Sequence, residues 1–219
     1  MTSKIISDYQ LLKEFTENSS HEFQTPIAII QGKLENMLEE NNLSQSQMNS
    51  LIEMQSTLSR LSKMTTSLSL LTKIENHEFN NTEKLNLSVI LRALLKEYEE
   101  LLILKKITLS MDLAKDIEIS GDRVLVQIML TNLISNAIRH NIESGKINLT
   151  LSANTFIIWN SGLPTDVNPA DFFERFKKSN QHVNSLGLGL SIVQKIAENY
   201  KYRISYQVED DRHILKLNF

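Results

Sequence analysis

The sequence predicts a chain of two parts, in which an antiparallel helical hairpin is followed by an α/β sandwich domain, an α + α/β fold class. Residues 5–74 carry apolar positions at helical spacing, a polar segment interrupts this pattern, and short apolar strands alternate with helices after it. We therefore expect a hairpin domain at residues 1–76, a linker at 77–82 and a second domain at 83–219.

The composition is that of an ordinary globular protein. Of 219 residues, 41% are apolar and 22% are charged. The formal net charge is −3 and basic residues are thinly spread, so we expect no nucleic acid partner. The lack of cysteine excludes disulfides and thiolate metal sites, and it is compatible with a reducing compartment. Because no run of about 18 apolar residues occurs, we expect membrane attachment only through upstream segments absent from this chain.

The first part begins with one long predicted helix, from Ile5 to about Glu40. Its apolar stripe recurs mostly at spacings of three, four or seven residues, as one helix face requires. The stripe runs through Ile5, Tyr9, Leu12, Phe15, Ser19, Phe23, Ile30, Leu34 and Met37. The polar stretch 41–47 ends it, and Ser44 followed by Gln47 has the spacing of a capping box that starts a new helix.

A second helix is predicted from Met48 to about Ile74. Its stripe contains Met48, Leu51, Leu58, Leu61, Thr65, Leu68 and Leu71. Two long helices joined by a short loop form an antiparallel hairpin. Because one hairpin cannot cover its own apolar stripe, we expect a homodimer in which two hairpins pair into a four-helix bundle.

The sequence of the second part predicts an α/β layer domain. Strands are expected at 85–87, 107–111, 117–119, 203–208 and 213–219, with a further hairpin formed by 146–151 and 155–159. Helices are expected at 88–104, from an N-cap at Asp122 to about His140, and at 189–199.

The first helix carries a histidine in the segment SHEFQTP at 20–26. At about 100° per residue, His21 lies about 180° from Ile30, so it faces away from the apolar stripe. Thr25 lies about 40° from His21, and Glu22 sits beside it. Glu22 can orient the imidazole and accept its proton, which suits a nucleophilic histidine. Taken alone, the pattern is more often an exposed histidine beside a helix break.

A second polar set lies on the helix that Asp122 is predicted to begin. Asn132, Asn136 and Arg139 share one face at spacings of four and three. Amide oxygens can ligate Mg²⁺, and an arginine can pair with phosphate oxygens. The alternative is a helix whose polar residues face solvent.

Three further segments have compositions that suit a nucleotide site. WNSGLP at 159–164 ends a predicted strand with a turn, and FFERF at 172–176 is aromatic. SLGLGLSIV at 185–193 opens the last helix, where glycines let backbone N–H groups approach phosphate. Each has a structural alternative, namely a plain turn, a core aromatic cluster and a chance Gly-x-Gly.

In this order, the five segments resemble the phosphoacceptor, N, G1, F and G2 motifs of sensor histidine kinases of two-component systems. The resemblance covers nearly the whole chain from about residue 5. It implies a HisKA-type dimerisation and phosphoacceptor domain followed by an ATP-binding domain of the Bergerat type. It further implies that His21 is phosphorylated by ATP with Mg²⁺, that Glu22 assists, and that Thr25 supports dephosphorylation of the partner.

The resemblance also assigns nucleotide contacts. Asn136 coordinates Mg²⁺ with Asn132 beside it, Arg139 contacts phosphates, and Asn160 accepts a hydrogen bond from the adenine amino group. The other implied cofactor-binding positions are His140, Gly162, Phe173, Arg175, Gly187, Leu188, Gly189 and Leu190. The chain departs from the family pattern where Asn160 replaces aspartate, Pro164 and Ser185 replace glycines, and His140 stands at a position that is often tyrosine.

The implied protein is a cytoplasmic kinase that passes its phosphoryl group to an aspartate on a response regulator receiver domain, as part of a membrane-anchored sensor. Two other functions are open. The replacements at 160, 164 and 185 motivate a pseudokinase that acts as a dimeric signalling scaffold. An ATPase of the same nucleotide-binding superfamily is disfavoured because Asn132 stands where those ATPases carry a catalytic glutamate.

Overall fold

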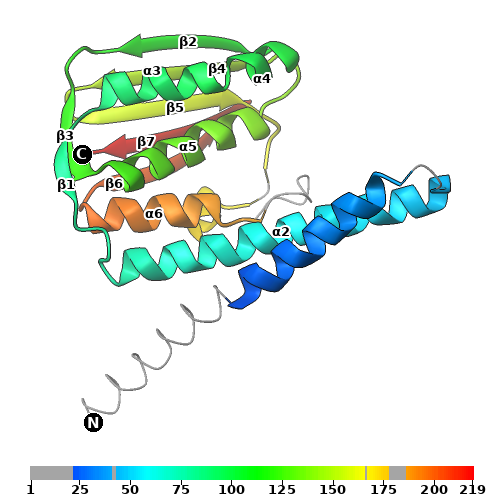
Figure 1. The fold of residues 1–219 in the computed structure, drawn as a ribbon. Coiled ribbons are helices and arrows are strands. Elements are labelled where there is room, and N and C mark those ends of the chain that lie inside the picture. The colour runs from blue at the N-terminus through cyan, green and yellow to red at the C-terminus, as the bar shows by residue number, and fades with distance from the viewer. Residues whose placement is uncertain (1–21, 41–42, 166, 178–185) are drawn as a thin grey trace, which may run out of the picture. The chain divides into compact units, whose positions relative to one another are not determined.

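The computed structural model describes residues 22–40, 43–165, 167–177 and 186–219. The chain forms two compact units, Met1–Asn76 and His77–Phe219, which are described separately below (Figure 1). Among the described residues, none of the helices has the length and apolar character needed to cross a membrane.

The first unit is an antiparallel pair of helices. One helix covers residues 22–38 and the other, α2, covers Gln45–Glu75. The predicted capping box is confirmed, because Ser44 Oγ accepts from Gln47 N and the Gln47 side chain accepts from Ser44 N. The amide of Gln24 donates to Thr66 Oγ1 at 3.5 Å, which links the two helices.

The buried stripe of the first helix differs from the predicted one. Ile27 and Leu34 are 5% exposed, whereas Phe23 and Ile30, which we placed in the stripe, are 57% and 45% exposed. A single neighbouring helix covers only a narrow strip of a helix surface, so apolar residues that flank this strip remain accessible. The four-helix bundle that would cover them stays a prediction.

The second unit is built on a five-stranded sheet in the order β2-β4-β5-β7-β6. The strands are β2 Thr108–Leu113, β4 Lys146–Ser152, β5 Thr155–Ser161, β6 Arg203–Glu209 and β7 Arg212–Asn218. The pair β2–β4 is parallel and the other pairs are antiparallel. A separate antiparallel pair joins β1 Thr82–Asn86 to β3 Glu118–Asp122.

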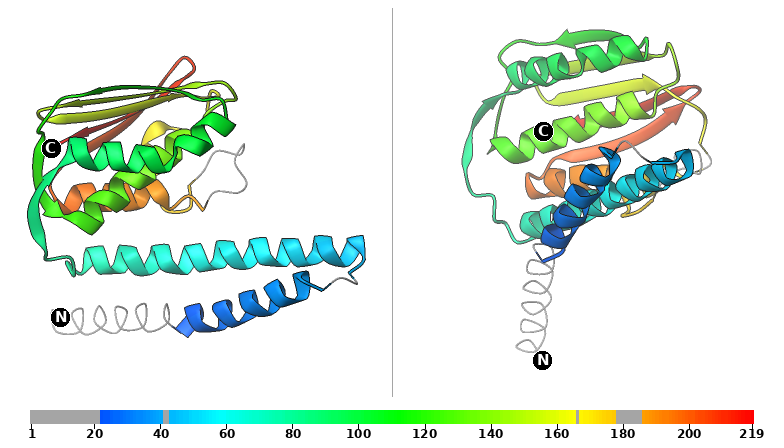
Figure 2. Two further views of the ribbon diagram at one scale, coloured as in Figure 1. Left: turned by 45° about the horizontal axis from the view of Figure 1, so that its top comes forward. Right: turned by 45° about the vertical axis from the view of Figure 1, so that its right-hand side comes forward.

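Three helices, α3 Leu87–Glu97, α5 Arg123–Arg139 and α6 Gly189–Asn199, cover one face of this sheet (Figure 2). The core lies between these layers, because buried apolar residues alternate along the strands and form one side of each helix. From the sheet it contains Ile147, Leu149, Leu151, Phe156, Ile158, Leu215 and Leu217, and from α5 and α6 it contains Leu125, Val126, Met129, Leu133, Ile134, Ile192, Val193 and Ile196.

Two local features differ from the prediction. The helix expected at 88–104 is broken at Tyr98 into α3 and a short α4, Glu99–Leu104. A 3₁₀ helix, η1, forms at Pro169–Phe173 and was not predicted; Asn168 caps it by accepting from Ala170 N at 3.2 Å. The remaining predicted strands and helices of this unit are confirmed to within a few residues.

Candidate functional site

The helix α5 presents the asparagines of the second polar set. Its start is fixed by Asp122, whose carboxylate accepts from Val124 N at 2.8 Å and from Leu125 N at 3.3 Å. Asn132 and Asn136 are partly buried on this helix. Asn132 Nδ2 donates to the carbonyl of Ile128 at 2.8 Å, so its amide oxygen points away from the α5 backbone.

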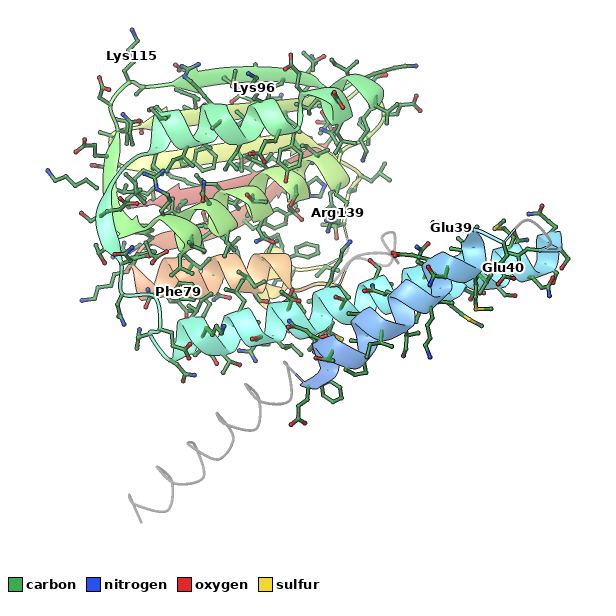
Figure 3. All side chains as sticks on the ribbon, viewed as in Figure 1. Glu39, Glu40, Phe79, Lys96, Lys115 and Arg139 are labelled. Atoms are coloured by element: carbon green, nitrogen blue, oxygen red, sulfur yellow. The ribbon has the colours of Figure 1, made fainter. Side chains whose placement is uncertain are left out.

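Arg139 lies at the opposite, C-terminal end of α5, where its side chain is exposed (Figure 3). Burial raises the pKa of Tyr98, with a further rise from Glu97 and an opposing effect from the positive charge of Arg139. The guanidinium of Arg139 is therefore close enough to Tyr98, at the break between α3 and α4, to influence the pKa of its phenol.

The start of α6 meets Asn132 directly. A Cβ added to Gly189 would lie 2.8 Å from Asn132 Oδ1, so only glycine allows this approach without a shift. Leu188, the N-cap of α6, has no side-chain oxygen that could accept from the first N–H groups of the helix. These N–H groups and the Asn132 amide oxygen thus meet at one place, which suits an anion together with a cation.

Gly187 joins the aromatic segment to the start of α6. Its φ of +67° is in the left-handed region that favours glycine. A Cβ there would lie 2.6 Å from Lys177 O, and Phe176 N donates to Gly187 O at 2.9 Å. The residue brings the segments 176–177 and 187–189 together.

The end of β5 lies against the C-terminal end of α5. Asn160 is 2% exposed, and its Nδ2 donates to His140 O at 3.4 Å and to Ser161 O at 2.8 Å. A Cβ on Gly162 would lie 3.3 Å from His140 O. The helix α5 therefore meets the strand-ending turn at His140, next to its C-terminal end, and meets Gly189 at Asn132, nearer its middle.

The aromatic segment is more exposed than these glycines. Phe173 is partly buried in η1, Arg175 is exposed, and Phe176 is 47% exposed. Lys177 pairs with Asp171 at 3.5 Å and with Glu174 at 3.6 Å, which holds the segment in a compact turn. Leu188 is 2% exposed and belongs to the core, whereas Leu190 is partly buried.

The predicted phosphoacceptor His21 and the glycine replacement Ser185 lie outside the described residues. Glu22 and Thr25 are exposed on the first helix. They belong to the unit that does not carry α5 and α6.

Both units match known protein families. Residues 11–77 match the family described as "His Kinase A (phospho-acceptor) domain", and residues 121–214 match "Histidine kinase-, DNA gyrase B-, and HSP90-like ATPase". The chain belongs to the sensor histidine kinases of two-component systems. The fold of the second unit is accordingly the α/β sandwich of histidine kinase catalytic domains.

Individual histidine kinases are similar over most of the chain. The sensor histidine kinase HprS of Escherichia coli is 29% identical over 99% of this chain, and the heme sensor protein HssS of Staphylococcus aureus is 30% identical over 90%. The chain spans 49% of HprS and 44% of HssS, about half the length of each. The solved structure of the Acinetobacter baumannii histidine kinase AdeS is 26% identical, with a TM-score of 0.61 over 91% of this chain and 96% of that one.

One residue beside the strand-ending turn was not singled out by the sequence. His213 on β7 lies against Gly162, because a Cβ there would be 2.2 Å from His213 Cδ2. The sequence placed it on a strand, and the signal that could have found it was an ionisable residue in the inward alternation of that strand. Its ring nitrogens contact Tyr206 on the neighbouring strand β6 and Leu163, which is 50 residues away in the sequence.

Proposed function

We propose that this chain is the cytoplasmic kinase core of a longer sensor, which phosphorylates its own His21 with ATP and passes the phosphoryl group to an aspartate of a response regulator receiver domain. The observation that carries the proposal is the contact between Asn132 and Gly189 at the start of α6. The lengths of HprS and HssS support a longer sensor, of which this chain corresponds to about half.

The start of α6 is suited to hold the phosphates of ATP. Its N–H groups carry the positive end of the helix dipole, and Gly189 lets the Asn132 amide oxygen approach this end closely. Asn136 and Asn132 offer amide oxygens, which are hard donors suited to Mg²⁺. When bound, Mg²⁺ would neutralise phosphate charge.

In the transfer step, a ring nitrogen of His21 attacks the γ-phosphorus of ATP. The N–P bond forms, the bond from the γ-phosphorus to the bridging oxygen breaks, and ADP leaves with that electron pair. Glu22 is the neighbouring group that accepts the imidazole proton. Catalysis of this kind consists mainly of positioning and charge stabilisation. Thr25, one helical turn after His21, supports the reverse dephosphorylation of the response regulator.

We also propose that the kinase is a homodimer through the helical hairpin. A cavity of about 510 Å³ between its two helices is lined by the apolar residues Ile30, Leu34, Met54 and Leu58 together with the polar residues Ser50, Glu53 and Thr57. Ile30 and Met54 are 45% and 54% exposed, so a single hairpin leaves this surface open.

The proposal is tested by incubating the protein with γ-labelled ATP and Mg²⁺ and measuring acid-labile label. We expect label on the wild type and on His77→Gln, a control histidine that is exposed in the other unit. We expect none on His21→Gln, and a loss of at least about tenfold on Asn136→Ala because a metal ligand is removed. No label on the wild type, with no nucleotide binding by calorimetry, would favour the scaffold instead.

A further inference from the structure

His213 is a buried ionisable side chain without a role in the kinase chemistry proposed above. It is 8% exposed on β7 and is the register partner of Asn160 on β5. Its ring occupies the space beside Gly162, where a Cβ would lie 2.2 Å from Cδ2 and 2.5 Å from Nε2. His213 therefore packs on the turn that ends β5.

Both ring nitrogens of His213 have hydrogen-bonding partners, and these partners select one tautomer of the neutral ring. Nε2 lies 2.8 Å from the carbonyl oxygen of Leu163. A carbonyl oxygen only accepts, so Nε2 carries the proton and donates. Nδ1 of the neutral ring is then an acceptor, and the hydroxyl of Tyr206 donates to it. Burial raises the pKa of Tyr206 well above its ordinary value, so the phenol keeps the proton that it donates.

The same contacts hold the turn and the aromatic segment together. Gly162 N donates to Asp211 O at 2.8 Å, so the turn is tied to the β7 hairpin by one bond from Gly162 and one to Leu163. On the other side, the Tyr206 ring meets the Phe172 ring edge-on, with centroids 5.2 Å apart. The Tyr206–His213 pair is thus interposed between η1 and the turn after Asn160.

We propose that His213, oriented by Tyr206, is a positioning residue for nucleotide binding, which holds the Gly162–Leu163 turn in the conformation that receives the base. The inference rests on the proposed function, because it assigns the turn to the ATP site. The His213 side chain would thus restrain this turn next to Pro164, which replaces the second glycine of the family pattern. His213 acts through the turn and has no part in phosphoryl transfer.

The test compares ATP affinity and turnover of full-chain variants. His213→Leu removes both hydrogen bonds at similar volume, and we expect the Kd for ATP to rise about tenfold while kcat of autophosphorylation changes less than about twofold. Tyr206→Phe removes only the orienting bond, so we expect a rise of about threefold. His213→Gln, which keeps a donor for Leu163 O, is expected to recover at least half of the lost affinity. Lys216→Ala, on the opposite face of β7, is the matched control and is expected to bind as the wild type does.

Nitrogen-15 NMR of the His213 ring adds a readout that is independent of nucleotide. We expect the tautomer protonated on Nε2 in the wild type and a loss of this single tautomer in Tyr206→Phe. A ring protonated on Nδ1 overturns the inference. A His213→Leu variant that binds ATP as tightly as the wild type also overturns the inference, whatever its melting temperature. This result would not affect the kinase proposal. A wild type that binds no ATP overturns the kinase proposal, and the inference falls with it.

Discussion

Asn132 on α5 and Gly189 on α6 lie so close that a Cβ on residue 189 would stand 2.8 Å from Asn132 Oδ1. The Asn132 side chain has little room to retreat, because its Nδ2 is bonded to the carbonyl of Ile128. The contact joins two segments that are distant in sequence and fixes where the first N–H groups of α6 point.

The Gly189→Ala variant tests this contact. The added methyl must displace Asn132 or the start of α6, so we expect the Kd for ATP to rise about tenfold, with a change in stability below about 1 kcal/mol because alanine also favours the helix. Calorimetric titration with ATP and Mg²⁺ measures the affinity. Gly32→Ala is the matched control: a Cβ at 32 meets nothing within 4 Å, so we expect unchanged affinity and a gain of about 0.5–1 kcal/mol. Equal affinities for Gly189→Ala and wild type would contradict the assignment of α6 to phosphate.

Asn160 gives a prediction that runs against the family pattern. Its Nδ2 donates to two carbonyls, those of His140 and Ser161, and Asn160 is almost fully buried. In Asn160→Asp a carboxylate oxygen would face these carbonyl oxygens without a proton to donate. We therefore expect a loss of about 1–3 kcal/mol of stability, seen as a lower midpoint in urea unfolding, and no gain in ATP affinity.

The matched control for Asn160→Asp is Asn148→Asp, a partly buried asparagine on the neighbouring strand β4. Its amide donates to the hydroxyl of Ser110 at 2.8 Å, and a hydroxyl can also donate. We expect this variant to lose less than about 0.5 kcal/mol. If Asn160→Asp binds ATP more tightly at unchanged stability, the hydrogen bonds from Asn160 Nδ2 to His140 O and Ser161 O do not stabilise the fold, and the prediction is wrong.

Asp122 is expected to stabilise the second unit through the start of α5. Its carboxylate satisfies two N–H groups in a buried setting, so Asp122→Ala should cost about 1–2 kcal/mol. Asp122→Asn keeps an acceptor oxygen and should recover most of this loss. Thermal unfolding measures both. The idea fails if alanine and asparagine variants melt at the same temperature.

The exposed methionine Met54 tests dimerisation through the hairpin. It is 54% exposed beside the apolar cavity of the first unit, so a glutamate there would place a charge in an apolar interface. We expect Met54→Glu to sediment as a monomer at concentrations where the wild type is a dimer. Met111→Glu, at a methionine that is 46% exposed on β2, should sediment as the wild type does. A monomeric wild type would remove the basis for the dimer.

Local signals predicted most elements because they depend on nearby residues. Asp122 and Ser44 start helices where the sequence places them, since each cap is completed within three residues. The last helix begins at Gly189 and ends at Asn199, as its apolar spacing predicts. The break at Tyr98 was missed because no glycine or proline marks it, and the apolar periodicity predicted one continuous helix across this position.

The sequence by itself determined the two-part fold, the order of elements and the candidate residues of the kinase motifs, because periodicity, caps and motif spacing are local properties. Tertiary structure decided which of these residues meet. Asn132 meets Gly189, Asn160 meets His140, and His213 meets Leu163 only when segments that are apart in the sequence pack together. The width of apolar surface that one helix can cover decided that Ile27 and Leu34 are buried while Phe23 is exposed.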